Sequence, residues 1–88
     1  MEKTKEKTFN KSEKKDKLSI VVYNDDVNTF DWVIESFVSV CGHDHIQAEQ
    51  CAMIIHNNGK CDVMTGSYDY LKPFCLELLN RQLSAKIE

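Results

Sequence analysis

The feature that most limits how this chain can fold is the division of its apolar residues into six short groups, separated by glycine, asparagine or aspartate. Three groups are β-branched or alternate with polar residues, which predicts strands, and three repeat every three or four residues, which predicts helices. The expected strands are residues 18–23, 61–65 and 83–87, and the expected helices are residues 30–41, 45–57 and 70–79. This order predicts an α+β domain with two layers, β-α-α-β-α-β, in which a three-stranded antiparallel sheet packs against the helices.

Residues at the ends of these segments support the helix boundaries. Asn28 or Thr29 can cap the first helix and Asp44 the second, because their side-chain oxygens accept hydrogen bonds from backbone N–H groups that lack a partner. Gly42 and Gly59 follow these helices, at the position where a left-handed residue commonly ends a helix.

Pro73 conflicts with the third helix, because a proline inside a helix removes a hydrogen bond and clashes with the preceding turn. In the first turn a proline loses nothing, since the N–H groups there have no partner within the helix. We therefore expect the third helix to begin near Asp69 or Tyr70.

Charge separates the first 17 residues from the rest of the chain. They hold seven of the eleven basic residues and only two large apolar ones, so we expect a flexible lysine-rich tail at residues 1–17 and a folded domain at residues 18–88. The tail has a net charge of +3 and the domain of −6, which argues against binding of nucleic acid by the domain. A signal peptide has an apolar stretch after its basic residues, and none follows the lysines here. No run reaches the roughly 20 apolar residues of a membrane span. We expect a cytoplasmic protein that does not bind membranes.

Four cysteines and three histidines are the side chains best suited to metals: Cys41, Cys51, Cys61, Cys75, His43, His45 and His56. Without a secretion signal, a disulfide framework is not expected. No CxxC pair is present, and the spacing does not match a zinc site. We interpret Cys51 and Cys75 as small core residues and His43 and His45 as solvated, and we expect neither a metal nor a cofactor. A zinc- or redox-responsive domain is the alternative.

Asn24, Asp25 and Asp26 place three acceptor side chains between the first strand and the first helix. Such residues often only form a turn and cap a helix, but loops held by rigid elements also carry function. If the first two helices form an antiparallel hairpin, the start of one lies near the end of the other, and Asn24 and Asp25 approach His56. Helix residues three and four apart then form an apolar recess beside them: Phe30, Val33, Ala52 and Ile55.

A free peptide N-terminus fits such a recess, because an ammonium group has three N–H donors and the first side chain is adjacent to it. A hydrolase is the competing use of two aspartates and a histidine. However, the sequence has no nucleophile with a base and orienting group at recognisable spacing, and no oxyanion or metal signature.

Two segments resemble the ClpS family, the adaptors of the bacterial Clp protease: VVYNDD at residues 21–26 and QAEQCAMIIHNNGKC at residues 47–61. ClpS-type sequences typically have an apolar strand, Asn-Asp-Asp, a helix, a second helix with Gln-Ala, and His-x-x-Gly-Lys. The distance from Asn24 to His56 agrees with the family without a gap, and the resemblance extends over residues 18–88. It implies a binding adaptor rather than an enzyme. ClpS proteins recognise N-end rule substrates whose first residue is Leu, Phe, Tyr or Trp, and deliver them to a AAA+ unfoldase of the ClpA or ClpC type.

The resemblance also implies roles for individual residues. The α-amino group would be bound by Asn24, Asp25 and His56. The loop and the peptide backbone would be held by Asp26, Asn28 and Thr29. The side-chain pocket would be lined by Phe30, Val33, Ala52, Ile55 and Leu83. The unfoldase would be contacted by Lys72 and Ser67.

The chain departs from the family at several of these positions. The run Asn28-Thr29-Phe30 stands where many members have Thr-Pro-Met, and Ala52 stands where many have a large side chain. The smaller wall at Ala52 leaves more room, so we expect bulky Trp or Tyr to be tolerated. Ser67 stands where an acidic residue is common. A plain α+β interaction domain, which docks on an unfoldase or ribosomal factor without an amine pocket, is the third reading. We expect a monomer, because no helix has an additional apolar face.

Overall fold

The structure is a computed structural model of the 88-residue chain and describes residues 17–88. Its elements are β1 (Leu18–Tyr23), α2 (Phe30–Cys41), α3 (His45–Asn58), β2 (Lys60–Gly66), α4 (Tyr68–Asn80) and β3 (Ser84–Ile87). Their order and the antiparallel three-stranded sheet confirm the predicted α+β fold. The predicted tail lies outside the described residues, except for Lys17.

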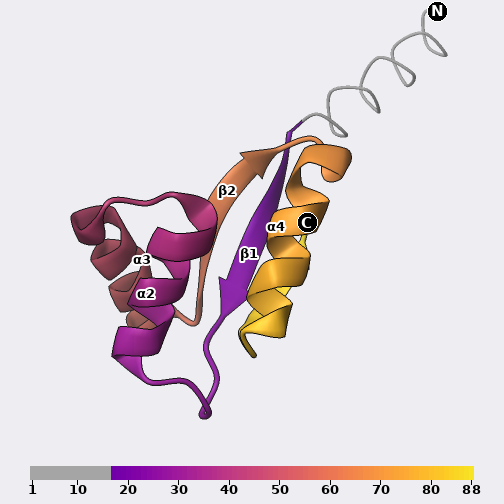
Figure 1. Ribbon diagram of the computed structural model, residues 1–88. Coiled ribbons are helices and arrows are strands. Elements are labelled where there is room, and N and C mark those ends of the chain that lie inside the picture. The colour runs from indigo at the N-terminus through magenta and orange to yellow at the C-terminus, as the bar shows by residue number, and fades with distance from the viewer. Residues whose placement is uncertain (1–16) are drawn as a thin grey trace, which may run out of the picture.

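The central strand β1 pairs with β2 on one side and β3 on the other, both antiparallel. Tyr23, its last residue, pairs with Lys60 at the start of β2 and with Ser84 at the start of β3. The α2–α3 pair lies on the β2 side of β1 and α4 on the other side (Figure 1). The loop that leaves β1 therefore emerges between the C-terminal end of α3 and the connection from α4 to β3.

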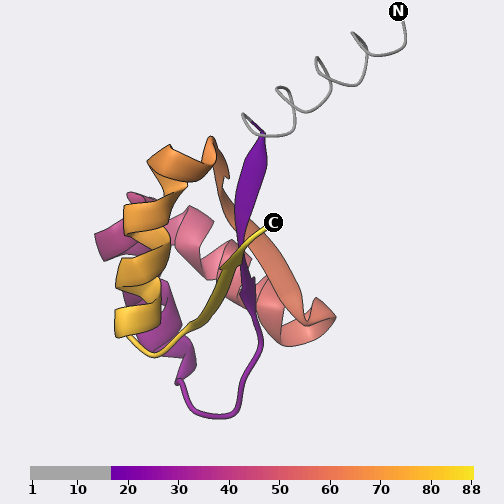
Figure 2. The ribbon, with the colours of Figure 1, turned by 90° about the vertical axis from the view of Figure 1, so that its right-hand side faces the viewer.

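The core lies between the sheet and the helices. Ile20 from β1, Phe37 from α2, and Leu71 and Leu78 from α4 have no exposed surface. Burying each such side chain stabilises the fold by about 1.5–3 kcal/mol relative to leaving it exposed. Figure 2 shows α4 as a layer beside the sheet, with β3 next to β1. This packing fixes the ends of the helices and strands, and so the positions of the loops that join them.

The predicted helix boundaries are confirmed for α2 and α3. The Trp32 N–H donates to Thr29 Oγ1 at 3.1 Å, and the Gln47 N–H donates to Asp44 Oδ1 at 2.7 Å. The glycine that ends each of these helices has a left-handed backbone. The end of α3, which carries His56, is thereby fixed directly before β2.

The expected position of Pro73 in a first helical turn is wrong. Ser67 caps α4, since its Oγ accepts a hydrogen bond from the Tyr70 N–H at 3.2 Å, so the helix begins at Tyr68. Pro73 is thus inside the helix, and the Asp69 carbonyl receives no N–H from it. The helix therefore begins earlier than the expected start near Asp69 or Tyr70, because the Ser67 side chain caps it.

The C-terminal end of α4 is closed by a left-handed residue that is not glycine. Gln82 has φ of 74°, its N–H donates to the Leu79 carbonyl at 2.9 Å, and the Leu83 N–H donates to the Leu78 carbonyl at 3.1 Å. These two bonds form a Schellman motif, in which glycine is the usual left-handed residue.

We expect the substitution Gln82→Gly to raise the free energy of unfolding by about 0.5–1 kcal/mol, because glycine adopts this conformation without steric cost. Gln50→Gly is the matched control. Gln50 lies inside α3, so this change should lower the same quantity by about 1 kcal/mol. Urea denaturation of both variants measures the difference, and a destabilised Gln82→Gly chain would contradict the expectation.

Candidate functional site

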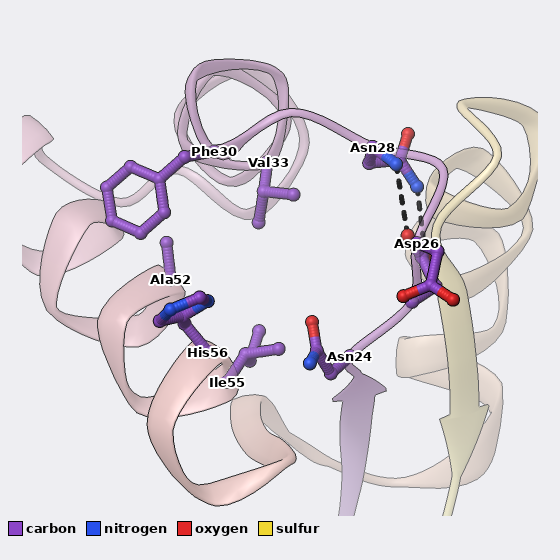
Figure 3. A pocket seen from close by; sticks show the side chains of 9 residues that line it. Asn24, Asp26, Asn28, Phe30, Val33, Ala52, Ile55 and His56 are labelled. Atoms are coloured by element: carbon purple, nitrogen blue, oxygen red, sulfur yellow. Dashed lines mark hydrogen bonds between the residues drawn. The ribbon is translucent and has the colours of Figure 1, made fainter.

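A hollow of about 360 Å³ opens where the loop after β1 faces the α2–α3 pair. It is lined by Asn24, Asp25, Asp26, Asn28, Phe30, Val33, Ala52, Ile55 and His56. In Figure 3 the side chains from α2 and α3 lie across the hollow from those of the loop. The structure therefore brings together all the residues expected at the amine and side-chain sites, apart from Leu83.

The strand register explains why residues 32 positions apart meet here. Tyr23, the last residue of β1, pairs with Lys60, the first residue of β2. The residue after β1, Asn24, therefore lies beside the residue before β2, Gly59, and the Asn24 N–H donates to the Gly59 carbonyl at 2.8 Å. His56 lies three residues before Gly59, in the last turn of α3. The sheet thus sets Asn24 beside the histidine end of α3.

The floor of the hollow is apolar and its rim is polar. Ala52 and Ile55 are 3% and 5% exposed, and Val33 is half-buried. Phe30 is 38% exposed at the edge, and Asn24 and His56 are exposed as well. A guest with an apolar side chain can bury it on the floor while a polar group stays at the rim.

Asp25 holds the loop in place through both carboxylate oxygens. Oδ1 accepts hydrogen bonds from the Val27 and Asn28 N–H groups, each at 3.0 Å, and Oδ2 accepts one from Asn28 Nδ2 at 2.9 Å. Partial burial acts to raise the pKa of Asp25, but these bonds and the nearby Ser84 side chain outweigh it, so the pKa lies below its ordinary value. The carboxylate is therefore charged throughout the neutral range.

Asn28 links this loop to a distant part of the chain. Its Nδ2 donates to Asp25 and also to the Gln82 carbonyl, at 2.8 Å. Within residues 17–88, no group donates a hydrogen bond to the exposed Asp26 carboxylate. The loop is thus held by Asp25 and Asn28 rather than by Asp26, which leaves the Asp26 carboxylate available to a guest.

The remaining expected site residues lie elsewhere. Leu83 is 3% exposed and packs in the core, so it does not line the hollow. Thr29 caps α2 and Ser67 caps α4. Lys72 is exposed on α4, beside a second hollow of about 350 Å³. Gln82 and Ser84 were not anticipated; only the pairing of Tyr23 with Ser84 could have indicated their closeness to Asp25.

The expectation that His43 is solvated is wrong, whereas His45 is exposed. His43 is buried, with Nε2 at 2.9 Å from the Val63 carbonyl, and its Nδ1 has no hydrogen-bond partner among the described residues. The sequence around His43 is polar, so its burial under β2 has no local signal.

The cysteines are free thiols placed against the core. Cys75 is buried as predicted, but Cys51 is only half-buried. Burial raises the pKa of Cys41 to about 11, and burial together with the neighbouring Cys51 thiol raises that of Cys61 to about 12. These two thiols therefore remain protonated at neutral pH. In the part of the chain described, no three His, Cys, Asp or Glu side chains are arranged to hold a metal ion.

The helices of residues 17–88 are all too short or too polar to cross a membrane. Their arrangement has a counterpart in a solved structure, that of Agrobacterium tumefaciens ClpS2 bound to L-phenylalaninamide. The two chains are 17% identical, with a TM-score of 0.77 over 85% of this chain and 98% of that one, so they share the fold. No curated protein sequence matches this chain significantly. Residues 13–86 match the family of the ATP-dependent Clp protease adaptor protein ClpS, and the chain belongs to that family.

Proposed function

We propose that this chain binds the free N-terminus of proteins that begin with Leu, Phe, Tyr or Trp, and delivers them to a AAA+ Clp unfoldase. The observation that carries the proposal is the hollow between the loop and α2–α3, with oxygen and nitrogen acceptors on its rim and an apolar floor. The resemblance of the sequence gives the same residues these roles. The chain acts as an adaptor and catalyses no reaction itself.

The rim suits an α-ammonium group, which carries one positive charge and three N–H donors. Asp25 supplies a fixed negative charge, although its oxygens already accept hydrogen bonds from the loop. The amide oxygen of Asn24, next to Asp25 on the loop, and a ring nitrogen of His56, across the hollow on α3, provide further acceptors. Hydrogen bonds between charged partners are about twice as strong as neutral ones, so this end supplies the discrimination against a blocked N-terminus.

The floor suits the first side chain of the bound protein. Phe30, Val33, Ala52 and Ile55 surround a space that a leucine or an aromatic ring can occupy (Figure 3). L-Phenylalaninamide, the ligand of the ClpS2 structure that shares this fold, has both a free α-amine and a phenyl ring. The same combination of groups is what the rim and floor can receive together.

Delivery to the unfoldase is assigned to α4 and to the tail. Lys72 and Ser67 are proposed to contact a ClpA- or ClpC-type unfoldase, with Lys72 exposed beside the second hollow. We further propose that the chain acts as a monomer and that residues 1–17 engage the unfoldase during delivery. Co-migration of the full chain with each type of unfoldase in size-exclusion chromatography identifies the partner.

Fluorescence anisotropy tests the amine pocket directly. Labelled peptides that differ only at the first residue (Phe, Leu, Trp, Arg, Ala and acetyl-Phe) are titrated with the full chain. Binding of free Phe, Leu and Trp without binding of Arg, Ala or acetyl-Phe is the expected result. Equal or absent binding across all six peptides would rule out an N-terminal amine site.

The pH dependence of this binding has an expected window. Because the folded-state pKa of Asp25 is below its ordinary value, its charge contributes above about pH 4 and is lost only as the pH falls through that lowered pKa. At the other end, an α-amino group loses its charge and one donor above about pH 8. We expect the affinity for a Phe peptide to fall as the pH rises from 7.5 to 9.5, about tenfold for each unit above the α-amino pKa. An affinity that is flat across this range would show that the ammonium charge is not recognised.

A further inference from the structure

We propose that residues 81–84, the connection from α4 to β3, form a brace that positions Asp25 for amine binding, with Trp32 and Arg81 as its positioning residues. The proposal rests on the proposed function, because it concerns how the amine-binding loop is held. Its basis is a continuous set of hydrogen bonds that runs from α2 through the brace to the loop.

The loop contacts the brace at two points. Asn28 Nδ2 donates one hydrogen bond to the Gln82 carbonyl at 2.8 Å and another to Asp25 Oδ2 at 2.9 Å, so one amide group joins the brace to the carboxylate. The Ser84 side chain also lies close enough to the Asp25 carboxylate to help lower its pKa. The position of Asp25 therefore depends on a segment more than 50 residues away.

The other side of the brace is fixed to α2. Trp32 Nε1 donates to the Arg81 carbonyl at 2.9 Å, and the Arg81 guanidinium lies 5.1 Å from the centre of the Trp32 ring. Arg81 Nη1 also donates to Ser36 Oγ at 3.4 Å, and Ser36 is fully buried. Trp32 itself is 37% exposed, so its indole acts here through this contact rather than as a core side chain.

The backbone of the brace is held firmly enough to set the position of Asp25. This backbone is held by the two hydrogen bonds of the Schellman motif at the end of α4, and the next residues enter β3. The loop from Asn24 to Asn28, in contrast, contributes no residue to the buried core. A loop that is already ordered before the peptide binds loses less conformational freedom on binding, which raises the affinity.

A double-mutant cycle tests the brace. Trp32→Phe keeps an aromatic ring but removes the Nε1 donor, and Asn28→Ala removes the amide that joins brace and loop. We expect Trp32→Phe to weaken binding of a free Phe peptide about three- to tenfold in the wild-type background. In the Asn28→Ala background the same change should cost less than about twofold, because the link it acts through is already cut. Tyr68→Phe, a similar loss at an exposed aromatic residue of α4, should leave binding unchanged.

Amide hydrogen exchange separates positioning from general loss of stability. The Val27 and Asn28 N–H groups are bonded to Asp25, so Trp32→Phe should speed their exchange while that of the core residue Phe37 stays unchanged. Equally faster exchange of all three amides would mean that Trp32 only stabilises the fold, and the proposed brace would be rejected. Unchanged affinity and exchange in Trp32→Phe, with normal wild-type binding, would overturn the brace and leave the amine pocket intact. If the wild-type chain fails to bind any free N-terminus, the proposed function falls and the amine-positioning role falls with it.

Discussion

Asp25→Asn is expected to fold normally and to lose about 10- to 100-fold in affinity for peptides with a free Phe, Leu or Trp N-terminus. The substitution keeps the size of the side chain but removes the negative charge that faces the ammonium group. In the wild-type chain Asn28 Nδ2 donates to the Asp25 carboxylate at 2.9 Å. The substitution sets an N–H₂ group, which is also a donor, against Asn28 Nδ2, so this bond is lost. Both effects act on the rim, so the ratio of free-Phe to acetyl-Phe binding should fall towards one. Anisotropy with this pair of peptides measures the ratio.

Asp62→Asn is the matched control for Asp25→Asn. Asp62 is exposed on β2, does not line the hollow, and its substitution makes the same change in net charge. Its peptide affinities should equal those of the wild type at physiological ionic strength, because distant surface charges are screened there. If both variants lose affinity equally, the effect comes from the net charge of the domain and Asp25 has no special place in the pocket.

Ala52→Met is expected to change which first residue the pocket accepts. The Ala52 side chain lies on the floor, next to Phe30, and is 3% exposed (Figure 3). Three further heavy atoms there remove space that a tryptophan needs and a leucine does not. Overfilling a packed site costs about 1–3 kcal/mol, so the Trp-to-Leu affinity ratio should fall about tenfold or more.

A graded series makes the Ala52 test independent of folding. Ala52→Val adds less volume than Ala52→Met, so its effect on the Trp-to-Leu ratio should be intermediate, while thermal denaturation reports the stability of both variants. A parallel loss for Leu and Trp peptides would mean that the first side chain lies elsewhere. In the wild-type chain, a strong preference for Leu over Trp would contradict the expected room at this wall.

The apolar half of the site could be predicted because helical periodicity is local. Residues three and four apart on α2 and α3 share a face, and once the two helices pair, Val33, Ala52 and Ile55 must lie together. The approach of Asn24 to His56 followed from the same pairing. These inferences needed only side-chain spacing and the short connection between the two helices.

The parts that escaped prediction depend on backbone groups or on distant residues. The Gln82 and Arg81 carbonyls are acceptors that every residue has, so nothing in the sequence marks them as partners of Asn28 and Trp32. Asp25 accepts the hydrogen bonds that hold the loop and Asp26 does not. Because the two residues are identical and adjacent, the sequence does not indicate which carboxylate has this role. Leu83 was expected in the pocket only because the family resemblance implies it, but Leu83 follows the turn at Gln82 and packs in the core.

The hydrogen bond between Asn28 and Gln82 has a consequence for the order of events during synthesis. A ribosome makes the loop, α2 and α3 well before it makes residues 81–84, which follow the loop by more than 50 residues and emerge after it. Until they do, Asp25 lacks part of the structure that orients it, even when α2 and α3 are already paired. A nascent chain that has not yet exposed residues 81–84 should therefore bind a free N-terminus more weakly than the complete fold does.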